Sequence, residues 1–255
     1  MDTLVIGVVV LIGSALTLFS GFGLGTLLMP VMAIFFPIEL AIFLTAIVHL
    51  FNNLFKLFFF YRHIDWKIII RFTPAAIVGS LLGSLLLIQI GNLNHDIIVP
   101  FTKTTTNFIN ITIGSLLLIF ALMEWTPADL RPAFDKKWLP IGGAISGFFG
   151  GLSGHQGALR SAFLAKTSLS KDALIATGII IATFIDISRM TNYAAQMNIQ
   201  TLKQNGALLT FTIVCSSLGV ILGKKLLGSV TLPLLQKIIA ISLITFSMCL
   251  IIGWL

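Results

Sequence analysis

Two apolar stretches of the chain carry polar side chains at helical spacing. The first stripe consists of His49, Asn52, Asn53 and Lys56. The second consists of Thr183, Asp186, Arg189 and Tyr193. Steps of three and four residues put the members of each stripe on one helix face. Because ionisable groups inside a membrane helix are expensive and face a bundle interior or a wet cavity, these faces are candidate ligand sites.

Each stripe also has a purely structural interpretation, which the sequence leaves open. Lys56 fits a cation that extends from a span end toward water. Arg189 fits an ion pair with Asp186, three residues earlier on the same helix, since burying one charge without the other is costly. A shift of one residue in the alignment of the two stripes matches Asn53 with Asp186 and Lys56 with Arg189.

Glycines interrupt two further apolar segments, 16–27 and 148–159, at corresponding places about 130 residues apart. Such paired breaks indicate a transporter's substrate site, because irregular backbone at membrane depth is tolerated only around protein or a wet cavity. A helix that begins there presents free N–H groups and a positive dipole end, which favours an anion. The candidate binding residues are Ser20, Gly21, Gly23, Gly25 and Thr26 in the first break, and Ser153, Gly154, His155, Gln156 and Gly157 in the second.

His155 and Arg160 extend the second break. A neutral imidazole at position 155 is suited to donate to an oxyanion or to exchange a proton, so His155 and Asp186 are the candidates for proton coupling. Arg160 reaches either the cavity or the cytoplasmic rim. The regular pairs Gly79/Gly83 and Gly219/Gly223 have the small-x-x-x-small spacing of helix packing and are assigned to that role.

The run Gly151-Leu-Ser-Gly-His155 also resembles the Gly-x-Ser-Gly of rhomboid-type intramembrane proteases, whose serine needs a histidine from a later span. No histidine follows His155, so the serine lacks its base and an enzyme is not expected. A membrane-embedded scaffold would leave the duplicated glycine breaks unexplained.

The composition is that of an integral membrane protein. Hydrophobic residues make up 57% of the chain and charged residues 10%, and the mean hydropathy is +1.04. Apolar stretches at 3–38, 40–55, 72–94, 104–123, 204–223 and 238–255 approach or exceed a membrane crossing, and 173–185 extends past Asp186. Asp2 and the length of the first stretch argue against a cleaved signal peptide. Cys215 and Cys249 have no metal or disulfide spacing, and no cofactor or nucleic acid is expected.

The first stretch is too long for one crossing and is expected to fold back at 21–25, with arms of about 16 and 11 residues that reach the middle of the membrane. The same re-entrant hairpin is expected in 138–166, with arms 138–149 and 158–166. An internal duplication relates the halves at an offset of about 132, matching Ala41 with Ala173, Thr45 with Thr177 and Tyr61 with Tyr193. The expected fold is all-α, with repeats at 1–124 and 138–255 joined by a cytoplasmic loop at 125–137.

The distribution of basic residues supports two oppositely oriented repeats. With one re-entrant hairpin and three crossings, each half crosses the membrane an odd number of times. The second half therefore has the opposite orientation to the first. With both termini outside, this layout puts twelve of the sixteen basic residues in the cytoplasm, two outside, and Lys56 and Arg189 within spans. If the chain instead made eight simple crossings, at best nine of the basic residues would lie inside and five outside. The positive-inside rule therefore favours the inverted pair.

The residues 20–30, Ser-Gly-Phe-Gly-Leu-Gly-Thr-Leu-Leu-Met-Pro, resemble the glycine-rich run of the sulfite exporter TauE/SafE family of bacterial membrane proteins. Residues 147–163 resemble the second copy in one subgroup, although His155 and Gln156 stand where glycines are frequent and Ser161 near the usual proline. The resemblance covers essentially the whole chain.

The resemblance implies a multi-pass protein of the bacterial inner membrane that exports sulfite or short organosulfonates such as sulfoacetate. Sulfate, phosphate and small carboxylates fit the same ligand class, and an amine or cation transporter that uses Asp186 is the alternative. The expected partners are the small anion and the lipid bilayer. Whether the chain forms a homodimer, and whether transport is proton-coupled, stay open.

Overall fold

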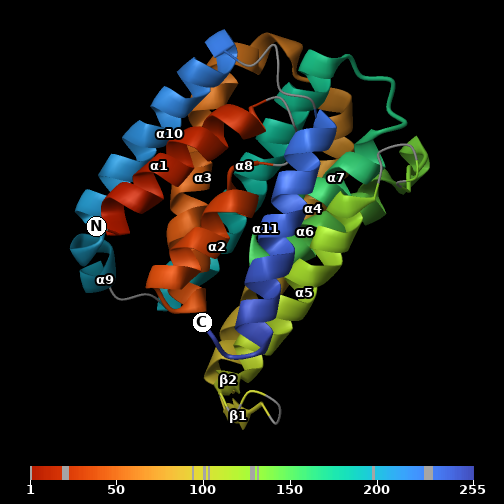
Figure 1. Ribbon diagram of the computed structural model, residues 1–255. Helices are drawn as coiled ribbons and strands as arrows, with labels where there is room; N and C mark the ends of the chain where they lie inside the picture. The colour runs from red at the N-terminus through yellow and green to blue at the C-terminus, as the bar shows by residue number, and fades with distance from the viewer. Residues whose placement is uncertain are drawn as a thin grey trace.

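The computed structural model describes residues 2–18, 23–93, 95–99, 102, 104–126, 130, 132–196, 199–226 and 232–255. The first half contains α1 (Asp2–Thr17), α2 (Gly25–Phe35), α3 (Ile38–Phe60), α4 (Trp66–Asn92) and α5 (Phe108–Trp125). The second contains α6 (Leu139–Ser153), α7 (Gly157–Leu164), α8 (Lys171–Gln196), α9 (Ile199–Gln204), α10 (Gly206–Leu226) and α11 (Leu232–Ile251). Single 3-10 turns cover Tyr61–His63 and Lys136–Trp138. Figure 1 shows the helices as one bundle.

A short β-hairpin departs from the all-helical expectation. Strands β1 (Asp96–Ile98) and β2 (Thr105–Asn107) pair antiparallel between α4 and α5 and project from the lower end of the bundle (Figure 1). Asn107 then starts α5, because its side chain accepts a hydrogen bond from the Asn110 N–H at 2.8 Å. Asp65 starts α4 in the same way, with the Ile68 N–H as donor at 3.0 Å.

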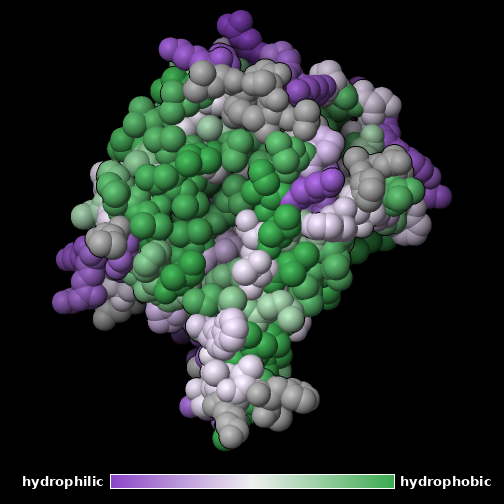
Figure 2. Space-filling model, viewed as in Figure 1, coloured by the Kyte–Doolittle hydropathy of each residue, from purple (hydrophilic) through white to green (hydrophobic). Residues whose placement is uncertain are grey.

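Six helices, α3, α4, α5, α8, α10 and α11, are long and apolar enough to cross a membrane, which confirms the predicted multi-pass protein. Figure 2 shows a broad hydrophobic surface over the middle of the bundle, with hydrophilic residues gathered toward its ends. Helices α3 and α8 are the innermost, since 67% and 72% of their apolar windows are buried, against 39–44% for the other four. The two polar stripes therefore lie on the two most enclosed helices.

Each half of the chain begins with two short helices. The arms α1 and α2 have 16 and 11 residues, as expected from the sequence. In the second pair, α6 continues to Ser153 instead of ending at 149, and α7 has only 8 residues. The reason is that Gly150 and Gly151 remain helical and serve close packing, against Gln156 and the backbone of Ser80, while the turn itself is made at Gly154.

The helices of one half pack mainly against helices of the other half. Helix α4 packs on α6, α10 on α1, α5 on α11 and α3 on α8. The glycine pairs make two of these contacts possible, as predicted. A methyl group at Gly79 or Gly83 would overlap the carbonyl oxygens of Ala144 or Phe148 in α6, and one at Gly219 or Gly223 would overlap Leu11 or Ala15 in α1.

Candidate functional site

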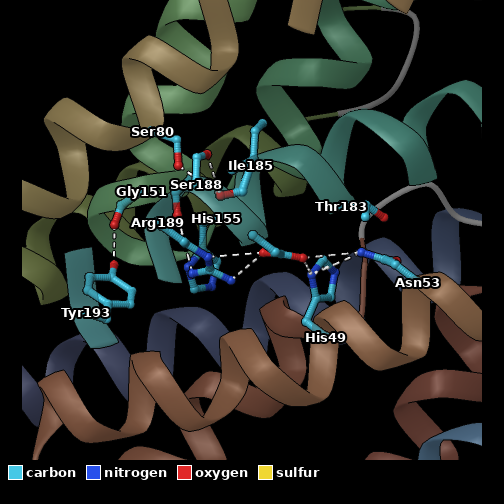
Figure 3. Close-up of polar contacts among 12 residues, drawn as sticks. His49, Asn53, Ser80, Gly151, His155, Thr183, Ile185, Ser188, Arg189 and Tyr193 are labelled. Atoms are coloured by element: carbon cyan, nitrogen blue, oxygen red, sulfur yellow. Dashed lines mark hydrogen bonds and ion pairs between the residues drawn. The ribbon is translucent and has the colours of Figure 1, made fainter. Parts of the chain in front are cut away.

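The antiparallel packing of α3 on α8 joins the two polar stripes. The Nδ1–H of His49 donates to Asp186 Oδ2 at 2.7 Å, and Arg189 donates to Asp186 Oδ1 through Nη2 at 2.7 Å and Nε at 3.1 Å. All three side chains are at least 95% buried. Figure 3 shows the resulting line of polar side chains, which runs from Asn53 and His49 to Arg189 and Tyr193. The i,i+3 ion pair considered for Arg189 and Asp186 is therefore present.

The asparagines of the first stripe diverge. The Asn53 amide lies 3.4 Å from Asp186 Oδ2 and belongs to the cluster. Asn52, one residue earlier, turns to the other side of α3 and donates to Ser14 Oγ at 2.5 Å, while Ser14 donates to the Ser216 carbonyl at 2.7 Å. Asn52 thus connects α3 to α1 and α10 and lies outside the cluster, although the sequence grouped it with the binding residues.

A cavity of about 270 Å³ lies against the cluster on the side of His49. Five of the residues selected from the sequence line it: Gly23, His49, Asn53, Lys56 and Arg160. The other lining residues are Thr17, Leu18, Ser161, Leu164, Lys171, Leu174, Ile175, Gly178, Ile179 and Ala182. Asp186 and Arg189 do not line it, because His49 stands between them and the cavity.

The charged part of the cavity wall is basic. Lys56 is 3% and Arg160 6% exposed, and Lys171 lies at the exposed start of α8. Lys56 Nζ donates to Thr17 Oγ1 at 3.5 Å. Arg160 was expected either in the cavity or at the cytoplasmic rim, and in the structure it lines the cavity. Thr17 and Lys171 were not among the binding residues expected from the sequence, although both line the cavity. Their positions at the ends of two apolar helices, beside the glycine break and the polar stripe, were the available clue.

The two hairpin turns lie close together. A methyl group at Gly25 would approach the Gly154 carbonyl oxygen to 3.8 Å. Gly23 and Gly154 have φ values of +86° and +80°, a conformation that side chains rarely adopt. Each glycine also leaves room for a polar side chain from the same half of the chain. A Cβ at Gly23 would lie 2.6 Å from His49 Nε2, and one at Gly154 would lie 2.9 Å from Arg189 Nη1. The glycines therefore position side chains of the cluster.

The second turn lies behind the cavity. His155 and Gly157 line a separate space of about 10 Å³ together with Thr26 and Glu124. His155 Nδ1 donates to the Ser153 carbonyl at 2.9 Å, and the imidazole stacks on Phe120. Gln156 is buried beside Gly150. Ser153, Gly154, His155, Gln156 and Gly157 are thus near the cluster but absent from the wall of the larger cavity. Ser20 and Gly21 lie outside the described residues.

The arrangement at Ser153 does not form a nucleophile and base. The hydroxyl donates to the Phe149 carbonyl at 3.1 Å, while His155 bonds to the carbonyl oxygen of Ser153 and not to its hydroxyl. Among the described residues there is no group of three His, Cys, Asp or Glu side chains that could hold a metal ion. The cavity brings together charged and hydrogen-bonding side chains of the kinds that bind small charged solutes.

A family model described as "Sulfite exporter TauE/SafE" matches residues 5–250, which is nearly the whole chain. No curated protein and no solved structure gives a significant match.

Proposed function

Because the chain belongs to the sulfite exporter TauE/SafE family, and is a multi-pass membrane protein of transporter type, we propose that it exports small sulfur-containing anions from the cytoplasm. Sulfite and short organosulfonates such as sulfoacetate are the proposed substrates. The cavity beside His49 is the proposed binding site, reached from the cytoplasm.

The charge of the cavity wall is the observation that carries this proposal. Lys56, Arg160 and Lys171 contribute basic groups, and no carboxylate lines the described part of the wall. Two of these cations are more than nine-tenths buried. Since opposite charges attract more strongly in a buried site than in water, this wall favours a bound anion over a bound cation.

The size of the cavity supports a small solute. At about 270 Å³ it lies just below the range of roughly 300–1,000 Å³ that holds drug-sized ligands. Its wall also offers neutral hydrogen-bond donors, the Thr17 and Ser161 hydroxyls and the Asn53 amide, which suit the oxygens of a sulfite or sulfonate group.

The alternative of an amine or cation substrate depends on Asp186. That carboxylate accepts hydrogen bonds from both His49 and Arg189 and stands outside the cavity wall. A cationic substrate would have to displace Arg189 or His49 to reach it. The geometry therefore favours the anion.

We further propose inverted repeats and alternating access. Apart from the 3-10 turns, the β-hairpin of the first half and the short α9 of the second, both halves have the same order of elements, two short helices and three long ones. Their contacts are reciprocal, since α4 packs on α6 as α10 packs on α1. In Figure 1 the long helices α3, α4 and α5 run opposite to α8, α10 and α11. These features support a pseudo-two-fold relation, in which rocking of one repeat against the other exposes the site to each side in turn.

Replacement of Lys56 by methionine tests the anion site. The purified protein is titrated with sulfite, sulfoacetate, sulfate, phosphate and taurine, and the affinities are compared with those of Lys56→Met. Loss of one buried charged hydrogen-bonding partner is expected to lower the affinity for the preferred anion by about tenfold or more, since hydrogen bonds to charged groups contribute about 1.5–3 kcal/mol. Lys67→Met, at the exposed start of α4, is the control and should bind like the unmodified protein.

Two results would contradict the proposal. Equal anion binding by Lys56→Met and Lys67→Met would show that the cavity is not the binding site. Binding of amines in preference to every anion would support the Asp186 alternative instead.

A further inference from the structure

The two repeats place the same pair of positions at opposite ends of the α3–α8 contact. Tyr61 corresponds to Tyr193 at an offset of 132 residues, and the same offset matches Phe43 with Ile175. Phe43 and Tyr193 lie at the outer ends of α3 and α8 in the proposed orientation. Ile175 and Tyr61 lie at the inner ends, and Ile175 lines the cavity. A comparison of the two pairs shows which end is closed.

At the outer end the pair is in contact and buried. The rings of Phe43 and Tyr193 meet edge to face, with their centroids 6.1 Å apart, and are 1% and 4% exposed. The Tyr193 hydroxyl donates to the carbonyl oxygen of Gly151, near the end of α6. Figure 3 shows Tyr193 and Gly151 at the end of the polar line opposite Asn53. Arg189 lies between them and His49.

At the inner end the equivalent tyrosine is exposed. The Tyr61 side chain is 52% exposed, and its hydroxyl accepts a hydrogen bond from Arg62 Nε at 3.0 Å. Ile175 lines the cavity. One side of the polar cluster therefore faces the cavity, while the other is covered by two rings in edge-to-face contact.

We propose that Phe43 and Tyr193 form the outer gate of the transport path, and that the hydrogen bond from Tyr193 to Gly151 holds this gate closed. The inference rests on the proposed alternating-access function. In a rocking motion of one repeat against the other, Phe43 of the first repeat and Tyr193 of the second must separate. The bond from Tyr193 to Gly151, which lies within the second repeat, holds the tyrosine ring in its position against Phe43. Its loss shifts the equilibrium toward the outward-open state.

The test measures access to the two ends of the path. A cysteine replaces Ala46, which is fully buried and corresponds to the cavity residue Gly178, in a background with Cys215→Ser and Cys249→Ser. A second reporter is Ile175→Cys, on the inner side. Membrane vesicles of known orientation are treated, without substrate, with a charged maleimide that does not cross the bilayer, and labelling rates are recorded from each side.

Tyr193→Phe keeps the ring and removes the hydroxyl. It is expected to raise outside labelling of Ala46→Cys by about three- to tenfold, the range given by one net intramolecular hydrogen bond. Inside labelling of Ile175→Cys should change less than twofold, because the inward-open form remains the major state. Tyr61→Phe, the equivalent change in the other repeat, is the matched control and should leave the outside rate unaltered.

Phe43→Leu provides an independent variant that removes the ring contact while the Tyr193 hydroxyl remains, and it should raise the outside rate as well. Unchanged outside labelling in both variants, or an equal increase in Tyr61→Phe, would overturn the gate. Sulfite efflux is measured in the same vesicles. Unchanged labelling with normal sulfite efflux would contradict only the proposed gate. Increased labelling without any sulfite efflux would contradict only the proposed substrate.

Discussion

At the scale of single residues, the site depends on side chains that hold one another in place. Asp186 is shared by His49 and Arg189, so the carboxylate fixes the orientation of the imidazole that faces the cavity. The nitrogen Nε2 of that imidazole is turned toward Gly23, whose left-handed backbone and missing side chain make the space it occupies. The glycine break is thus needed for the geometry of the protein itself, in addition to any approach of a ligand.

Gly23→Ala is therefore expected to displace the His49 imidazole and to destabilise the protein by about 1–3 kcal/mol, the usual range for a side chain forced into a strained backbone conformation. Thermal unfolding in detergent and anion affinity are the measurements. Gly25→Ala is the control, because a methyl group there would have its nearest neighbour at 3.7 Å, an ordinary contact. Equal stability and affinity in the two variants would show that Gly23 has no special role.

At the scale of elements, backbone contacts through glycine set the spacing between helices of opposite halves. The pair Gly79/Gly83 brings α4 against the carbonyl groups of α6, and Gly219/Gly223 brings α10 against those of α1. Close approach of helices through small residues is a main source of packing energy in a membrane, where there is no hydrophobic drive between helices. These contacts support the two hairpins whose turns meet beside the polar cluster.

A methyl group at Gly83 would overlap the Phe148 carbonyl, so Gly83→Ala should lower the free energy of unfolding by about 1–3 kcal/mol through overpacking. Chemical or thermal unfolding of the purified protein measures the change. Gly206→Ala is the matched control, since nothing lies within 4 Å of the added methyl group. A stable Gly83→Ala protein would mean that α4 and α6 separate without cost.

At the scale of the whole molecule, the distribution of charge agrees with one orientation in the membrane. The exposed Lys171 at the mouth of the cavity lies on the side assigned to the cytoplasm, together with Arg62 and Lys166. In Figure 1 the chain starts at the lower end of α1 and finishes at the lower end of α11, away from that side. The cavity therefore opens inward in the proposed topology.

Epitope tags added at the two termini are expected to be accessible from outside intact cells, because positive residues are retained in the cytoplasm and the termini lie opposite them. Antibody or protease access before and after permeabilisation is the measurement. A tag in the loop at 132–135 is the control and should become accessible only after permeabilisation. A cytoplasmic N-terminus would rule out the double-hairpin layout.

The sequence alone determined the spans, the two short-helix pairs and the polar faces of α3 and α8. Hydropathy and helical period are local properties, so they can be read along the chain without knowledge of neighbours. Together with the glycine breaks, they identified Gly23, His49, Asn53, Lys56 and Arg160, which meet at one cavity. The internal duplication gave the reason to expect equivalent residues in the two halves.

Only the tertiary structure decided which neighbour each polar face meets. Asn52 lies one residue from Asn53 yet bonds toward α1 and α10, and Asp186 sits behind His49 instead of in the cavity wall. The second glycine turn, with His155, is enclosed behind the cavity, whereas Thr17 and Lys171 line it. The physical reason is that helical spacing fixes the direction of a side chain about its own axis, while packing between distant helices fixes what lies in that direction.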